Sequence, residues 1–145
     1  MAERADAGDR MICPSARPEM DGAVAFGVVG GTAREPRVGY LSEPRPVSDE
    51  LLALAAPVTP VEVFRFAAPC VECACRHFDG SNCRLAQRTV RLLPVVAERL
   101  PPCRVRANCR WWRQEGRAAC LRCPQVVSEN ALPSAEARRA ATPEP

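Results

Sequence analysis

Cysteine is the residue whose type and spacing in this chain most clearly predict chemistry. Eight of the nine cysteines lie between positions 70 and 123, where they form two consecutive groups of four. Four thiolates complete the tetrahedral site of a zinc ion or hold one cubane iron–sulfur cluster. The sequence therefore predicts metal ligands at Cys70, Cys73, Cys75 and Cys83 in the first group, and at Cys103, Cys109, Cys120 and Cys123 in the second.

A disulfide framework is the alternative interpretation, and it is typical of secreted chains that carry a signal peptide. Residues 1–21 are charged and lack the apolar core of such a peptide. No stretch approaches the roughly 18 apolar residues that would span a bilayer. We therefore expect a cytoplasmic protein without a membrane partner, in which the thiols are reduced. The ninth cysteine, Cys13, is predicted to be a spare thiol in a polar leader.

The spacing of the cysteines leaves their assignment to sites open. The first group has the form C-x2-C-x-C-x7-C, and His77, the sole histidine of the chain, is an alternative ligand within it. The second has the form C-x5-C-x10-C-x2-C-P. Two consecutive sites are the simpler assignment. The C-x2-C pairs Cys70/Cys73 and Cys120/Cys123 could instead meet in one site, as they do in a zinc ribbon.

Iron–sulfur and zinc are the two candidate centres, and the pattern favours [4Fe–4S]. Cys123 followed by Pro124 resembles the Cys-Pro ending of bacterial ferredoxin-type cluster motifs, although the full C-x2-C-x2-C-x3-C-P run is absent. Gaps of five and ten residues are typical of clusters held by separated loops. Trp111 and Trp112 could shield such a cluster from water. One or two clusters, with zinc as the alternative, are therefore the expected cofactors.

Arginine supplies all twenty basic residues, as a GC-rich bacterial genome would produce. Residues 67–127 hold eleven Arg against four acids, a net charge of +7 in a chain of net charge +3. Arg beside negatively charged thiolate sites would lower their electrostatic cost. The alternative is an exposed Arg/Trp surface that binds nucleic acid or an acidic protein. The residues predicted for these surroundings or this surface are Arg104, Arg106, Arg110, Trp111, Trp112, Arg113, Arg117 and Arg122.

Secondary structure is predicted from the spacing at which apolar residues recur and from residues that cap helices. Residues 23–29 and 37–41 are expected to form a β-hairpin, and residues 49–55 a helix capped by Ser48 with a buried Leu51/Leu52/Leu54 face. Residues 61–66 alternate as in a strand. A helix is expected from Cys83, interrupted by Pro94, and Gly116 is a predicted helix C-cap.

Together these features predict a small α+β metal-stabilised domain with a short N-terminal hairpin, two or three helices, a cysteine-rich irregular C-terminal half and disordered termini. Its expected parts are a flexible leader at 1–21, a single domain at 22–127 (hairpin, helix and strand at 22–66, metal-binding part at 67–127) and a flexible tail at 128–145. No phosphate loop or catalytic triad is recognisable, so we expect no catalytic activity of its own. The predicted function is electron transfer or an accessory role in a larger enzyme system, with a protein partner. The alternative is a zinc-stabilised module that binds nucleic acid or an acidic protein.

Overall fold

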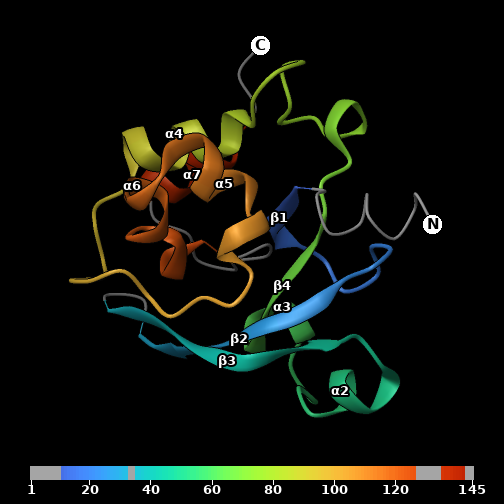
Figure 1. The fold of residues 1–145 in the computed structure, drawn as a ribbon. Helices are drawn as coiled ribbons and strands as arrows, with labels where there is room; N and C mark the ends of the chain where they lie inside the picture. The colour runs from blue at the N-terminus through green and yellow to red at the C-terminus, as the bar shows by residue number, and fades with distance from the viewer. Residues whose placement is uncertain (1–10, 33–34, 127–134, 143–145) are drawn as a thin grey trace.

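A four-stranded antiparallel sheet forms the base of the molecule in a computed structural model, which describes residues 11–32, 35–126 and 135–142 (Figure 1). The strands are β1 (Ile12–Ala16), β2 (Val24–Gly31), β3 (Pro36–Pro46) and β4 (Phe64–Pro69), in the order β1-β4-β2-β3. β2 and β3 pair from Val24 opposite Pro46 to Gly31 opposite Pro36. The predicted small α+β fold and its N-terminal hairpin are therefore confirmed.

The first edge of the sheet corrects the prediction of a flexible leader. β1 pairs antiparallel with β4, so that Ile12 lies opposite Pro69 and Cys13 opposite Ala68. β1 contains Pro14, which an edge strand tolerates because one side of it forms no ladder hydrogen bonds. Residues 12–16 of the predicted leader therefore belong to the sheet, and residues 1–10 lie outside the described part.

β4 begins three residues later than the predicted strand at 61–66. Pro60–Val63 instead forms a helical turn, α3, with Pro60 at its start and the Thr59 amide donating to Glu62 Oε2 over 3.3 Å. Such capping at an N-terminus overrides weak strand alternation. Residues 64–68 are all buried, because β4 lies between β1 and β2 and is covered on both faces.

The predicted helix after Ser48 is present as α2 (Asp49–Ala53). The Ser48 hydroxyl accepts a hydrogen bond from the Leu51 amide over 3.1 Å, as expected of an N-cap. The predicted buried face is only partly correct. Leu51 and Leu52 pack against the core of the sheet, whereas Leu54 is 73% exposed. The helix is shorter than predicted, and Leu54 is its C-cap.

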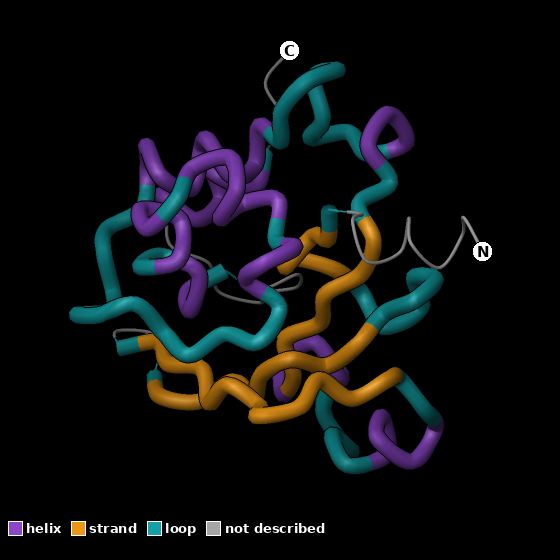
Figure 2. The backbone as a smooth tube through the Cα atoms, viewed as in Figure 1, coloured by secondary structure: helices purple, strands orange, loops and turns teal. Residues whose placement is uncertain are grey.

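The C-terminal half is built from short helical segments on one side of the sheet (Figures 1 and 2). The helices are α4 (Arg84–Leu92), α5 (Arg110–Glu115), α6 (Arg117–Cys120) and α7 (Ala135–Ala141), with 3-10 turns at Glu72–Ala74, Arg106–Asn108 and Cys123–Gln125. With α2 and α3, the described residues contain more than the two or three helices predicted. α4 ends before Pro94 and does not resume, because a residue preceding proline disfavours helical geometry.

The predicted tail is described only at residues 135–142, most of which form α7. α7 lies against α4, and the Nε of the buried Arg88 donates to the Ala140 carbonyl over 2.8 Å. The expected disorder at 1–10, 128–134 and 143–145 falls outside the described residues. Among those described, no helix has the length and apolar character needed to cross a bilayer.

Two small cores stabilise the two halves. One lies between the sheet and the helices α2 and α3, and includes Val61, Phe64 and Phe66. The other contains Trp111, which is 2% exposed, together with the cysteines Cys83 and Cys109. The second core thus depends on the same residues that the sequence assigns to metal.

Gly116 joins α5 to α6 and provides a test of this architecture. Its φ of 70° and ψ of −149° lie in a region that is essentially restricted to glycine, while nothing lies within 4 Å of the position that a β-carbon would take. Gly116→Ala should therefore cost about 1–3 kcal/mol of unfolding free energy through backbone strain alone. Denaturant unfolding would measure it.

Gly30→Ala is the matched control, because Gly30 has no positive φ and its nearest neighbouring atom would lie 4.0 Å from the added carbon. Equal stability of the two variants would contradict the role given to Gly116.

Candidate metal centres

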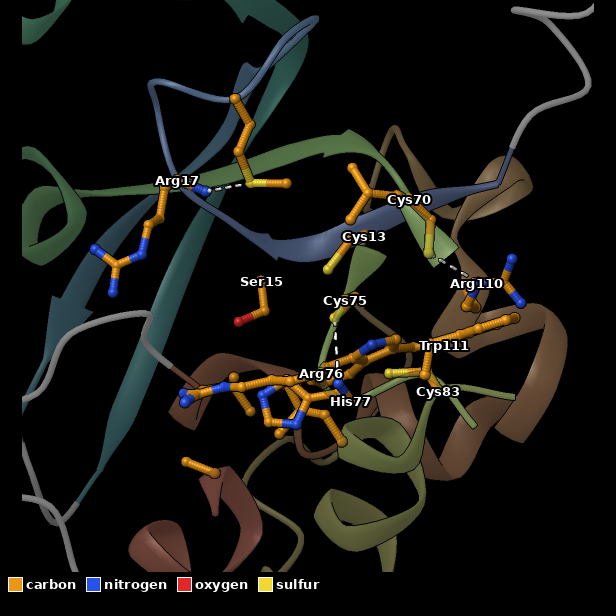
Figure 3. Close-up of a pocket in the computed structure, with 16 residues that line it drawn as sticks. Cys13, Ser15, Arg17, Cys70, Cys75, Arg76, His77, Cys83, Arg110 and Trp111 are labelled. Carbon is orange, nitrogen blue, oxygen red and sulfur yellow. Dashed lines mark hydrogen bonds between the residues drawn. The ribbon is translucent and has the colours of Figure 1, made fainter. Parts of the chain in front are cut away.

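Eight described cysteines lie around two cavities, four to each. The first cavity has a volume of about 270 Å³ and the second about 20 Å³. All eight of these cysteines are free thiols. Cys13, Cys70, Cys75 and Cys83 line the first cavity (Figure 3), and Cys103, Cys109, Cys120 and Cys123 line the second. The second set is the consecutive four predicted from spacing, whereas the first includes a residue that sequence reasoning set aside.

Cys13 is that residue, and its position corrects the prediction of a spare thiol in a leader. It lies on β1, and the β1–β4 pairing brings it beside the end of β4, where the Cys70 amide donates to the Met11 carbonyl over 2.9 Å. Cys75 follows the 3-10 turn Glu72–Ala74, and Cys83 is the N-cap of α4. The side chain of Cys73 lies outside the described part. No sequence signal near Cys13 indicates this placement, because it results from a long-range strand pairing.

Hydrogen-bond donors point at three of the sulfurs in the first cavity. The His77 amide donates to Cys75 Sγ over 3.4 Å, and the Ala86 amide donates to Cys83 Sγ over the same distance. Arg110 Nε donates to Cys70 Sγ over 3.3 Å (Figure 3). Donors of this kind stabilise thiolates and tune the metal they bind.

Arg110 is held in place by the loop that carries Cys70. Its guanidinium donates to Glu72 Oε2 over 2.8 Å and lies 5.0 Å from the ring centre of Phe78. Glu72 has a φ of 46°, a left-handed conformation that costs a non-glycine residue free energy. The ion pair with a buried arginine offsets part of this strain, so the loop after β4 is shaped around Arg110.

His77 is not arranged as a ligand. Its Nδ1 accepts a hydrogen bond from Arg88 over 2.7 Å. Because arginine only donates, Nδ1 must be the unprotonated nitrogen, and the proton of the neutral ring then lies on Nε2. Burial, and then the charges of Arg88 and Arg76, lower the His77 pKa to about 4 and keep the ring neutral. Neither nitrogen therefore offers a free lone pair to a metal.

The second cavity takes its cysteines from the ends of short helical segments. Cys109 is the N-cap of α5, Cys120 is the last residue of α6, and Cys123 begins the 3-10 turn that continues with Pro124. Cys103 lies in the loop before the turn Arg106–Asn108. Gly116 turns the chain between α5 and α6, as the sequence predicted, and so brings Cys120 back towards Cys109.

Arg65 is the main residue of the second site that sequence reasoning missed. It is 4% exposed, and its Nη2 donates to Cys123 Sγ over 3.2 Å and to the Pro14 carbonyl over 2.9 Å. Its Nη1 donates to the Cys123 carbonyl over 2.6 Å. A single arginine within an otherwise apolar run, Phe64 to Ala68, is the sequence signal that could have revealed it, since buried charges are paired or bind ions.

Tyr40 and Arg106 complete the wall of the second cavity. Burial, followed by the neighbouring Cys123 thiol, raises the pKa of the Tyr40 phenol. Arg106 stacks 5.5 Å from the Trp112 ring centre, and its hydrogen bond opposes the rise in the pKa of Cys120. Trp111 lines both cavities.

The remaining predicted Arg and Trp residues do not form one exposed surface. Arg110 and Trp111 are buried, at 7% and 2% exposure. Arg122 donates to the carbonyls of Leu93 and Ala118. Arg113 donates to the Ala107 carbonyl but is exposed, as are Arg104 and Arg117. Most of the set thus acts inside the cysteine-rich half.

The protonation of the thiols follows from their burial. Burial raises the pKa of Cys13 and of Cys109 to about 12, and it also raises the pKa of Cys83, Cys103 and Cys120. Neighbouring thiols also raise these pKa values. For Cys13 and Cys109, each of the cysteines that raise the pKa lines the same cavity. Buried thiols of this kind stay neutral at pH 7 unless a cation replaces their protons, so metal binding would release protons.

The four cysteines of each set line the wall of their cavity. Among the described residues, no three His, Cys, Asp or Glu side chains are close enough together to hold a metal ion. Comparisons with protein-family models, curated proteins and solved structures found no match to this chain.

Arg65→Met tests the contacts of the buried guanidinium. The substitution would leave the carbonyls of Pro14 and Cys123 without their donors, so the free energy of unfolding should fall by about 3 kcal/mol. Arg37→Met is the matched control, because the Arg37 side chain is 75% exposed and lies 3.6 Å from the equally exposed carboxylate of Glu35. That change should cost less than about 0.5 kcal/mol. Similar losses in the two variants, measured by denaturant unfolding, would contradict the role of Arg65.

Proposed function

We propose that this chain is a small iron–sulfur protein that holds one or two clusters of the [4Fe–4S] type, each ligated by four cysteines, and acts in electron transfer or as an accessory subunit of a larger enzyme system. The first ligand set is Cys13, Cys70, Cys75 and Cys83, and the second is Cys103, Cys109, Cys120 and Cys123. The observation that carries the proposal is the division of eight free thiols between two cavities, four to each.

Buried donors without acceptors favour a cluster over a single ion. Among the described residues, the buried side-chain nitrogens that lack a hydrogen-bond partner are Arg106 Nε, Arg106 Nη2 and Trp111 Nε1. Both residues line the cysteine cavities. A buried donor left unpaired costs about 1–3 kcal/mol. The sulfides of a cluster accept hydrogen bonds, whereas zinc brings no acceptor of its own, so a cluster would satisfy these groups.

The distribution of charge supports the same assignment. A [4Fe–4S] core in its usual oxidised state, ligated by four thiolates, carries two net negative charges. Arg65 and Arg106 lie at the second cavity, and Arg110 and Arg76 lie at the first. Positive charges at these positions offset the cost of the thiolates in a poorly solvated site.

The size of the first cavity also suits a multi-atom group. A cavity needs only about 10–15 Å³ to hold one water molecule, so 270 Å³ is far more than a single ion requires. Sulfurs around one zinc ion lie about 3.8 Å apart, as tetrahedral bonds of about 2.3 Å dictate. A cluster holds its thiolates further apart because its own iron and sulfide atoms lie between them. Metal ligation would also stabilise a domain with two small cores.

Zinc is the second candidate, and the volume of the second cavity favours it there. About 20 Å³ is close to the room that one small species takes. The accompanying idea of a nucleic-acid-binding module is weaker, because Trp111 and Arg110 are buried and unavailable for stacking on bases.

Metal analysis after anaerobic purification separates the candidates. We expect about four iron and four sulfide for each cluster, hence about eight of each per chain where both cavities are filled, and a broad absorption at about 400 nm that bleaches on reduction with dithionite. Iron near half this value with one equivalent of zinc would restrict the cluster to one cavity. A colourless protein with stoichiometric zinc would contradict the iron–sulfur proposal.

Single cysteine variants test the two ligand sets. Cys13→Ser and Cys109→Ser should each lose about half of the iron, because each removes a ligand from a different site. Cys73→Ser is the matched comparison for Cys13→Ser, since the two compete for one place in the first set, and it should keep all of the iron. The reverse result, with Cys13→Ser unchanged and Cys73→Ser depleted, would place Cys73 in the first site.

A further inference from the structure

The wall of the second cavity offers more free hydrogen-bond donors than acceptors. Arg106 lines this cavity, and its Nε and Nη2 atoms are buried without a hydrogen-bond partner among the described residues. The proline carbonyls of the lining are already engaged. The Pro14 carbonyl accepts from Arg65 Nη2 over 2.9 Å, and the Pro101 carbonyl accepts from the Cys103 amide over 2.9 Å. A ligand that accepts hydrogen bonds would therefore suit this cavity.

The charge of the same wall is positive. Arg106 belongs to the lining, and the buried guanidinium of Arg65 donates to the sulfur of Cys123, another lining residue, over 3.2 Å. Among the described residues that line the cavity, none is Asp or Glu. Arginine stays protonated in proteins, and cysteines that are free thiols carry no charge. Because buried charges are normally paired, an anion in the cavity would compensate the two guanidinium groups.

The size of the cavity restricts the anion to a small one. Its volume is about 20 Å³, and a cavity of about 10–15 Å³ holds one water molecule. A monatomic ion therefore fits, whereas a tetrahedral oxyanion such as sulfate is too large. A water molecule would also fit, but it donates two hydrogens, for which this wall has few free acceptors. An anion only accepts, so it matches the wall better than water does.

We infer that the second cavity, in the thiol form of the chain, binds one small monovalent anion of the halide class, held by the hydrogen-bond donors of Arg106 and the charge of Arg65. The inference goes beyond the proposed function, because it concerns the second cavity when its four cysteines hold no metal. Anion and metal exclude each other there, since a metal needs thiolates and occupies the same space. The first cavity stays available for a cluster.

Chlorine nuclear magnetic resonance tests the site directly. The full chain is kept reduced, freed of metal with a chelator, and titrated with sodium chloride at constant ionic strength. Exchange of chloride with a bound site should broaden the chloride signal. Bromide should remove the excess width by competition, and sulfate should not, because it is too large for the cavity. No excess width, equal competition by sulfate, or a metal-free chain that does not fold in chloride would each overturn the inference.

Arg106→Met and Arg104→Met form a matched pair. Each removes one positive charge from the same loop, but Arg104 is exposed and is not among the residues that line the cavity. Arg106→Met should weaken chloride binding about tenfold or more, because it removes charged donors. Arg104→Met should change the affinity less than about twofold, since solvent and salt screen an exposed charge. Equal losses would overturn the inference.

The wild-type competition between chloride, bromide and sulfate decides the question if Arg106→Met does not fold. Iron and sulfide are measured on protein that has not been treated with chelator. Failure of the anion site therefore leaves the proposed iron–sulfur function intact, and absence of iron leaves the anion site intact.

Discussion

The buried guanidinium of Arg65 connects the sheet to the cysteine-rich half of the molecule. It projects from the central strand β4, and its three hydrogen bonds reach Pro14 on β1 and both the carbonyl and the sulfur of Cys123. A buried cation must be compensated, and here the compensating groups are carbonyl oxygens and a thiol beside a cavity. The position of the second site relative to the sheet thus depends on this one side chain.

The burial of the thiols in a small core constrains their protonation. Thiols surrounded by protein resist deprotonation, and their pKa values rise, whereas four thiolates without a cation would repel one another. The arginines at the cavities, the amides that point at Cys75 and Cys83, and the unpaired nitrogens of Arg106 and Trp111 are all suited to a negatively charged group. On this proposal, metal ligation by the buried thiols is also what stabilises the cysteine-rich half.

Local signals in the sequence were sufficient to predict several of the helices, strands and turns. The Ser48 cap, the hairpin ended by Gly30 and Gly31, and the turn at Gly116 all result from interactions between residues close in the chain, so propensity and capping predict them. The prediction of a strand at 61–66 was wrong at its start for a related reason, because the capping around Thr59 and Pro60 was a stronger local signal than alternation.

The sequence by itself determined that this is a cysteine-rich chain with two sets of thiols and an excess of arginine beside them, because number, type and spacing are properties of the chain. Only the tertiary structure decided that Cys13 joins the first set, that Arg65 reaches Cys123, and that Trp111 lines both cavities. Each depends on the β1–β4 pairing or on packing of the helical half against the sheet. Such contacts join residues some 50 positions apart in the sequence, and local spacing carries no information about them.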